Sequence, residues 1–84
     1  MTYVKTEKIN KTVNNTGDII GYTLYISTQK GKRRKWAGER ETLHDIDILI
    51  RQNYLEKEFE YVSVNIIVKY TTGQSLIERC YKAI

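Results

Sequence analysis

Apolar and polar residues alternate along two segments of the chain, which predicts a β-strand in each. From Ile20 to Ile26, apolar or aromatic side chains at every second position are separated by Gly21, Thr23 and Tyr25. The stretch YVSVNIIVKY, from Tyr61 to Tyr70, has the same period and is rich in residues that favour strands. We expect this second strand to lie centrally in a sheet.

Two further segments carry weaker strand patterns. Tyr3 to Val13 contains Thr, Val and Ile, which favour extended backbone, although its second half is polar. Ser75 to Ile84 follows the short turn signal TTGQ. The short turn favours a returning strand, with Leu76, Cys80 and Ile84 on one face, over a short helix.

The period of the apolar residues changes after Thr42. One stripe at helical spacing contains Leu43, Ile46, Leu49, Ile50 and Tyr54. This stripe predicts an amphipathic helix packed on a core. Thr42 and Asp45 have the spacing of a capping box, with Asp in place of the usual Glu or Gln, so we expect the helix to begin after Thr42. Ile48, Leu55 and Phe59 lie off the stripe, so the helix is either covered on a second side or unwinds before Phe59.

The turn signals NNTGD, QKGK, AGE and TTGQ separate these segments. The residues RRKW after Gly31 are interpreted as the returning strand of a hairpin whose tip includes Lys30 and Gly31. The element order is then β-β-β-α-β-β. One helix on one face of a mostly antiparallel sheet makes an α+β two-layer domain. Eighty-four residues predict one domain, residues 1–84, whose small core leaves pairing into a homodimer open.

Composition restricts the class of protein. The chain has no apolar run of about 18 residues and no signal-peptide pattern, so we expect no membrane association and a cytoplasmic location. Its single cysteine excludes an intramolecular disulfide, and with one histidine it cannot form a Cys/His zinc cluster. We therefore assign Cys80 to packing.

Catalytic patterns are not found in the sequence. His44 falls in the first helical turn with no serine or cysteine partner indicated, and the five glycines are too scattered for a phosphate loop. Asp45 and Asp47 point about 200° apart on a helix and cannot share a metal. We expect a protein that is not an enzyme and that needs no cofactor and no metal.

Charge is unevenly distributed along the chain. Residues 1–40 carry nine Lys or Arg against three acids, residues 41–60 carry two against six, and residues 61–84 carry three against one. The cations concentrate between Lys30 and Lys35, whereas the acids concentrate on the expected helix. A basic patch of this kind is typical of contact with phosphate groups or with an acidic protein surface.

The candidate nucleic-acid-binding residues are Lys30, Lys32, Arg33, Arg34, Lys35, Trp36 and Arg40. The cations would bind phosphate, and Trp36 would stack on a base or support the hairpin. In a strand, Lys32, Arg34 and Trp36 share one face while Arg33 and Lys35 share the other, so only part of the group can face one ligand. The alternative is a charged hairpin tip that prevents aggregation, with Trp36 turned into the core under the helix.

The seven tyrosines give a second indication. We expect Tyr22, Tyr54 and Tyr70 on core faces. Tyr25, Tyr61 and Tyr81 would instead lie on the outer face of the sheet beside Lys69, Arg79 and Lys82. Aromatic and cationic side chains on one face suit a single-stranded nucleic acid or a protein partner.

Three short strands, the turn GKRRKW and a capped helix, over Thr16 to Tyr54, are together similar to the arm-type DNA-binding domains of tyrosine recombinases. In that family a three-stranded sheet enters the major groove, and the resemblance implies the same for this chain. The chain departs from the family because the strand Tyr61 to Tyr70 continues the domain after the helix.

Two hypotheses of function follow. In the first, the chain is a nucleic-acid-binding accessory or regulatory protein that uses the basic hairpin, Lys30 to Arg40, against the phosphate backbone. In the second, it is an interaction or inhibitor protein, for example a phage or mobile-element product that blocks a host protein or a nucleic-acid-binding protein. The second is favoured by the abundance of tyrosine and by the two-signed charge.

Overall fold

A computed structural model describes residues 1–10 and 17–84. The elements are, in order, β1 (Tyr3–Asn10), β2 (Ile19–Ser27), β3 (Lys35–Arg40), α1 (Leu43–Ile50), the π-helical segment η1 (Arg51–Leu55), β4 (Tyr61–Tyr70) and β5 (Gly73–Ala83). The expected β-β-β-α-β-β order and the α+β class are confirmed. Residues 11–13 of the first expected strand and residues 14–16 of the NNTGD turn lie outside the described residues.

The five strands form one antiparallel sheet in the order β1-β5-β4-β2-β3. β4 is the central strand, as its apolar pattern predicts. β1 pairs with β5 at one edge and makes no pair with β2. The first three strands therefore do not form a sheet of their own, and the expectation taken from the recombinase arm-type domains is wrong on this point.

Register divides the side chains between two faces of the sheet. Leu24, Ile66 and Ile77 lie opposite one another across β2, β4 and β5, and Ile9 of β1 continues the row. This face carries the core, whose buried apolar residues are Leu24, Ile26, Ile46, Leu49, Ile50, Val62, Val64, Ile66, Val68, Ile77 and Tyr81. Removing this apolar surface from water is the main stabilising contribution to the fold.

Helix α1 covers the core face. The hydroxyl Oγ1 of Thr42 accepts a hydrogen bond from the backbone N of Asp45 at 3.1 Å, which confirms the expected N-cap. Ile46, Leu49 and Ile50 are buried against the sheet. After Ile50 the chain widens into η1, which ends at Leu55. The helical segment thus ends before Phe59, as one of the two expectations had it.

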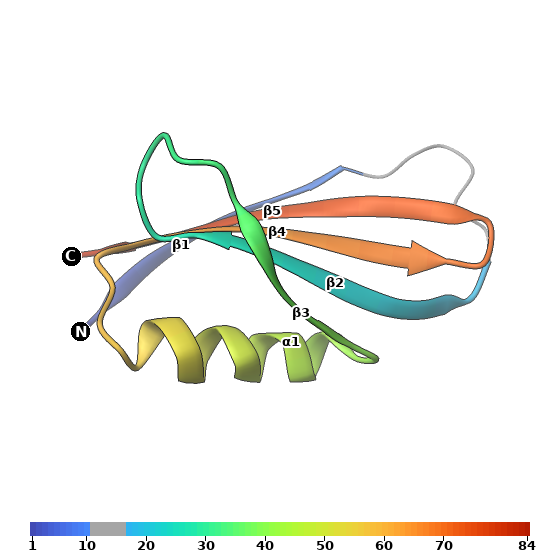
Figure 1. Ribbon diagram of the computed structural model, residues 1–84, viewed down its shortest axis with the longest axis horizontal. Helices are drawn as coiled ribbons and strands as arrows, with labels where there is room; N and C mark the ends of the chain where they lie inside the picture. Colours follow the sequence, from blue (N-terminus) through green and yellow to red (C-terminus); the bar gives the residue numbers. More distant parts are fainter. Residues whose placement is uncertain (11–16) are drawn as a thin grey trace.

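Figure 1 shows α1 on one side of the sheet and the loop between β2 and β3 rising on the other side. We call the face opposite α1 the open face, because none of the described elements covers it. The two ends of the chain lie together, with the backbone N of Ile84 donating to the carbonyl of Thr2 at 3.0 Å. In residues 1–10 and 17–84, no helix has both the length and the apolar character needed to cross a membrane.

Candidate nucleic-acid interface

The basic loop, residues 28–34, connects β2 to β3. Its turn is closed by a hydrogen bond from the backbone N of Lys32 to the carbonyl of Gln29 at 3.1 Å, and Gly31 has a φ of 79°, which glycine adopts readily. Strand β3 begins only at Lys35. The expectation that residues 32–34 alternate between two strand faces is therefore wrong, because they precede the strand.

Two of the loop cations reach the open face. The Nε of Arg34 donates to the hydroxyl of Ser63 at 3.0 Å, which holds its guanidinium over β4. Lys30 lines a hollow of about 620 Å³ together with Tyr61 and Lys82, at the end of the sheet where the chain termini lie. The loop is therefore folded toward the sheet.

The remaining loop cations surround a different hollow. Lys32, Arg33 and Lys35 line a space of about 510 Å³ with the end of β2 and the residues that follow it. All three cations are exposed to solvent. This arrangement brings three positive charges around one concave surface, the geometry in which an anionic group is attracted most strongly.

Trp36 lies on the open face, and 62% of its surface is exposed. The pairing of β2 with β3 shifts between Leu24 and Tyr25, so that Gly38 lies opposite Leu24 while Trp36 lies opposite Tyr25. Ala37 is the extra residue of this bulge, which sets the face that Trp36 occupies. The alternative that placed Trp36 in the core is wrong.

Arg40 is separated from the basic loop. It lies opposite Tyr22, four register positions along β2 from the Ile26–Lys35 pair, or about 13 Å at the rise of a strand. Its side chain lines a hollow with Leu49 and Tyr54, on the helix side. The structure therefore brings six of the seven candidate residues to one end of β3 and places Arg40 elsewhere.

None of the cations from Lys30 to Lys35 forms an ion pair with a described acid. The ion pairs among the described residues are made by the N-terminus, Arg51, Lys69 and Arg79. The acids of residues 41–60 are all exposed. Asp45 and Asp47 lie on α1, whereas Glu60 lines the hollow that also contains Lys30. Most of this negative charge is thus apart from the basic loop, and Glu60 is the exception.

The tyrosines are distributed largely as expected. Tyr22, Tyr54 and Tyr70 pack against the core. Tyr25 and Tyr61 are half-buried on the open face. Tyr81 is the exception, because it lies opposite Val62 on the core face with only 9% of its surface exposed. Its expected position on the outer face is wrong.

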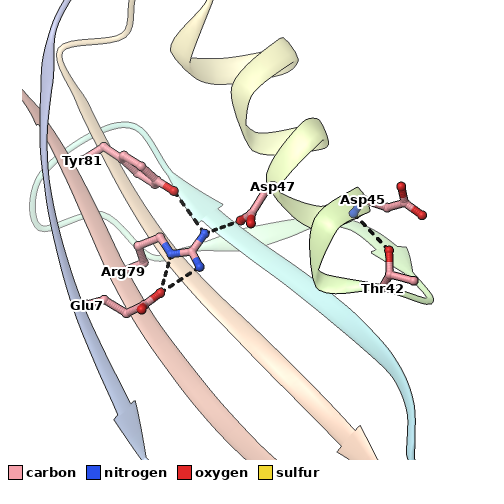
Figure 2. A network of polar contacts seen from close by, with 6 residues as sticks. All are labelled: Glu7, Thr42, Asp45, Asp47, Arg79 and Tyr81. Atoms are coloured by element: carbon pink, nitrogen blue, oxygen red, sulfur yellow. Dashed lines mark hydrogen bonds and ion pairs between the residues drawn. The ribbon is translucent and has the colours of Figure 1, made fainter.

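A polar network around Arg79, which the sequence interpretation missed, lies on the core face of β5 (Figure 2). Its Nη2 and Nε each lie 2.8 Å from one carboxylate oxygen of Glu7 in β1. Its Nη1 donates to Asp47 of α1 at 2.6 Å and to the hydroxyl of Tyr81 at 3.1 Å. One buried guanidinium therefore joins the first strand, the helix and the last strand.

The sequence did contain one sign of this network. Ile77, Arg79 and Tyr81 are alternate residues of one strand and therefore share a face, so Arg79 lies between two residues suited to the core. Burial alone lowers the pKa of Arg79, but the hydrogen bond from Arg79 to Asp47 and the further contacts raise it above its ordinary value. The pKa of Tyr81 is raised by burial, against the opposing effect of Arg79. Arg79 is therefore a charged structural group, and it is not part of the exposed outer face.

Cys80 is half-buried on the open face. With Thr6 and Ser63, its neighbours in register, it lines a hollow of about 270 Å³ that Arg34 also borders. The thiol thus contributes to the surface of this hollow, and the apolar core lies on the opposite side of the sheet.

Comparison of the chain with protein-family models, with curated protein sequences and with solved structures found no match.

Proposed function

We propose that this chain is a small, non-enzymatic nucleic-acid-binding protein of the cytoplasm, an accessory or regulatory factor that contacts the phosphate backbone through its basic loop. The observation that carries the proposal is the set of five cations from Lys30 to Lys35, which form no ion pair with any acid that the structure describes and lie beside an exposed Trp36. Cations that are not neutralised within the protein remain available to replace the counterions of a phosphate chain.

The net negative charge of residues 41–60 also supports contact through the basic loop. Like charge repels a polyanion, so the acids of residues 41–60 favour an approach from the side of the basic loop. Arg40 contributes to phosphate binding only if the nucleic acid also passes around the edge strand β3.

The test is a charge reversal in the loop with a matched control. The variant Lys32→Glu, Arg33→Glu, Arg34→Glu removes the proposed contacts. The control Lys5→Glu, Arg51→Glu, Lys57→Glu makes the same change in net charge with exposed cations outside the loop. Fluorescence anisotropy of labelled oligonucleotides at about 50 mM salt should show lost binding for the loop variant and little change for the control.

Equal loss in both variants would mean that net charge alone governs binding, and it would contradict a site on the loop. Failure of the wild type to bind any oligonucleotide at this salt concentration would reject the proposal.

A second candidate function is an interaction or inhibitor protein that docks on an acidic protein surface. The specific observation in its favour is the exposed Trp36 two residues from Arg34, because Trp and Arg are enriched among the residues that dominate protein interfaces. A pull-down with wild type and with Trp36→Ala distinguishes it, since a protein partner should be retained by the first and lost by the second.

A further inference from the structure

Three aromatic rings on the open face have no ring partner in the described part of the chain. Tyr25 lies between Asn65 and Trp36 in one row across the sheet, and Tyr61 lies further along β4. The ring contacts among the described residues are Tyr3 with Tyr81 and Tyr54 with Phe59, both on the helix side. The rings of the open face therefore stack on no other ring of residues 1–10 and 17–84.

Cations flank these rings. Tyr61 borders two hollows of the open face. One also contains Lys30, Lys82 and the acid Glu60, and the other contains Lys8, Arg34 and the acid Glu78. A ring with positive charge on both sides is suited to a base whose two neighbouring phosphates must be neutralised.

Of the acids that border the open face, only Glu39 forms an ion pair among the described residues. Glu39 pairs with Lys69 at 3.4 Å, and Glu78 accepts a hydrogen bond from the side-chain amide of Asn10 at 2.9 Å. The cations Lys8, Lys30, Arg34 and Lys82 take part in no ion pair among the described residues. Against these four cations stand two acids: Glu78, whose hydrogen bond with an amide leaves its charge in place, and Glu60, which lines the hollow of Lys30 and Lys82. The net charge that this face offers to a ligand is therefore positive but reduced.

The open face also holds polar groups that lack a partner. The hydroxyl of Thr23 and the side-chain oxygen of Asn65 are buried and make no hydrogen bond in the described part of the structure. Thr23 is only 4% exposed although it points away from the core. Because both atoms are inaccessible to solvent, they add no contact that a ligand could reach, and the inference rests on the rings and cations of this face.

We infer that the open face binds single-stranded nucleic acid, with bases stacked on Trp36 and Tyr61 and phosphates held by Lys30 and Arg34, the two cations of the basic loop that reach this face. The inference rests on the proposed function and names its ligand class. A duplex hides the faces of its bases within the stack, so it offers these rings nothing to stack on. Register places Trp36 and Tyr61 two strands and four residues apart, about 17 Å, which requires an extended strand of several nucleotides.

The test compares one oligonucleotide sequence, roughly 12 nucleotides long, in single-stranded and duplex form. The single strand should bind the wild type about 10-fold or more tightly than the duplex, and it should quench the fluorescence of Trp36, the one tryptophan of the chain. Trp36→Leu and Tyr61→Leu should each weaken single-strand binding roughly 10-fold and leave duplex binding nearly unchanged.

The control is Phe59→Leu, which removes a partly exposed ring on the helix side and should alter neither affinity. Circular dichroism checks that each variant is folded. Duplex binding equal to or tighter than single-strand binding would overturn the inference while the proposed function stands. Single-strand binding that survives both leucine variants, or that polyglutamate displaces as well as unlabelled oligonucleotide does, would also overturn it. Binding of neither form would reject the proposed function and the inference with it.

Discussion

Arg79 and its two carboxylate partners differ in their access to solvent. The side chain of Arg79 is 5% exposed, whereas those of Glu7 and Asp47 are 32% and 49% exposed. A carboxylate that loses its partner here can still be hydrated, but the guanidinium cannot. The free-energy cost of breaking the network therefore depends on which side is removed.

We predict that the double variant Glu7→Gln, Asp47→Asn is less stable than the single variant Arg79→Met. Removing both carboxylates leaves a buried charge uncompensated, at a cost of about 3 to 5 kcal/mol. Replacing Arg79 by an apolar side chain of similar length should cost about 1 to 2 kcal/mol, because the two acids turn to water. Urea unfolding of the three proteins measures both values. Equal loss in the two variants would show that Arg79 is hydrated in the native state.

The ionisation of Tyr81 makes the free energy of unfolding depend on pH in the alkaline range. Burial raises its pKa in the folded state above the value of about 10 that it has when unfolded. Between these two values the unfolded chain has released the proton and the folded chain has kept it. The stabilisation is thus complete below pH 10 and is lost as the pH rises through the folded-state pKa.

We expect the free energy of unfolding of the wild type to fall more steeply above pH 10 than that of Tyr81→Phe. The difference in slope has an upper limit of about 1.4 kcal/mol per pH unit, the value for one proton. Urea unfolding at several values between about pH 9 and 11 measures both slopes. Parallel curves would mean that the hydroxyl of Tyr81 titrates alike in both states.

Strand β3 and helix α1 approach each other closely at Gly38. This glycine is buried with a φ of 137°, and a Cβ added there would lie 3.1 Å from Cδ1 of Leu49. Gly31 in the basic loop also has a positive φ, but a Cβ added there would meet nothing within 4 Å. Substitutions at the two positions can therefore distinguish the free-energy cost of backbone strain from the cost of crowding.

Gly38→Ala should destabilise the fold by about 2 to 4 kcal/mol, because strain and overpacking act together. Gly31→Ala should cost about 1 to 2 kcal/mol, the contribution of the left-handed backbone alone. Thermal or urea unfolding of both variants tests the difference. A similar loss at the two positions would show that Leu49 moves aside without cost.

Elements with a strong local period could be predicted from the sequence. The alternation in β2 and β4 and the stripe of α1 each identify an element and its core face within a short segment. The position of β1 beside β5 could not be predicted, because strand pairing depends on residues that are distant in the chain. Tyr81 and Arg79 of β5 were wrongly expected on the outer face, because Ser75 and Arg79 interrupt the apolar pattern of the core face. The candidate cations were visible as a run, but the bulge that turns Trp36 to the open face was not.

At the scale of the whole molecule, charge is unevenly distributed about the sheet. Residues 41–60, which contain the helical segment, carry six acids against two cations, and Figure 1 shows the basic loop rising on the other side of the sheet. Such a distribution orients the protein as it approaches a polyanion and makes association sensitive to ionic strength.

Neutralising one cation that contacts a phosphate should reduce the salt dependence of binding by a fixed amount. Arg33→Gln should lower the slope of log affinity against log salt by about 0.7 for a single strand or about 0.9 for a duplex. Lys5→Gln, on the helix side, should leave the slope unchanged. Anisotropy titrations between about 50 and 200 mM salt measure both slopes. An unchanged slope for Arg33→Gln would exclude this side chain from the interface.

The pairing of β1 with β5 has a consequence for how the chain is made. Tyr3 lies opposite Ala83, so β1 has its partner only when β5, more than 60 residues further along the chain, has been synthesised. Contacts between such distant residues give the domain a high contact order, which is associated with slow folding. Until translation reaches β5, both β1 and one edge of β4 stay unpaired, and the nascent chain is exposed to aggregation during that interval.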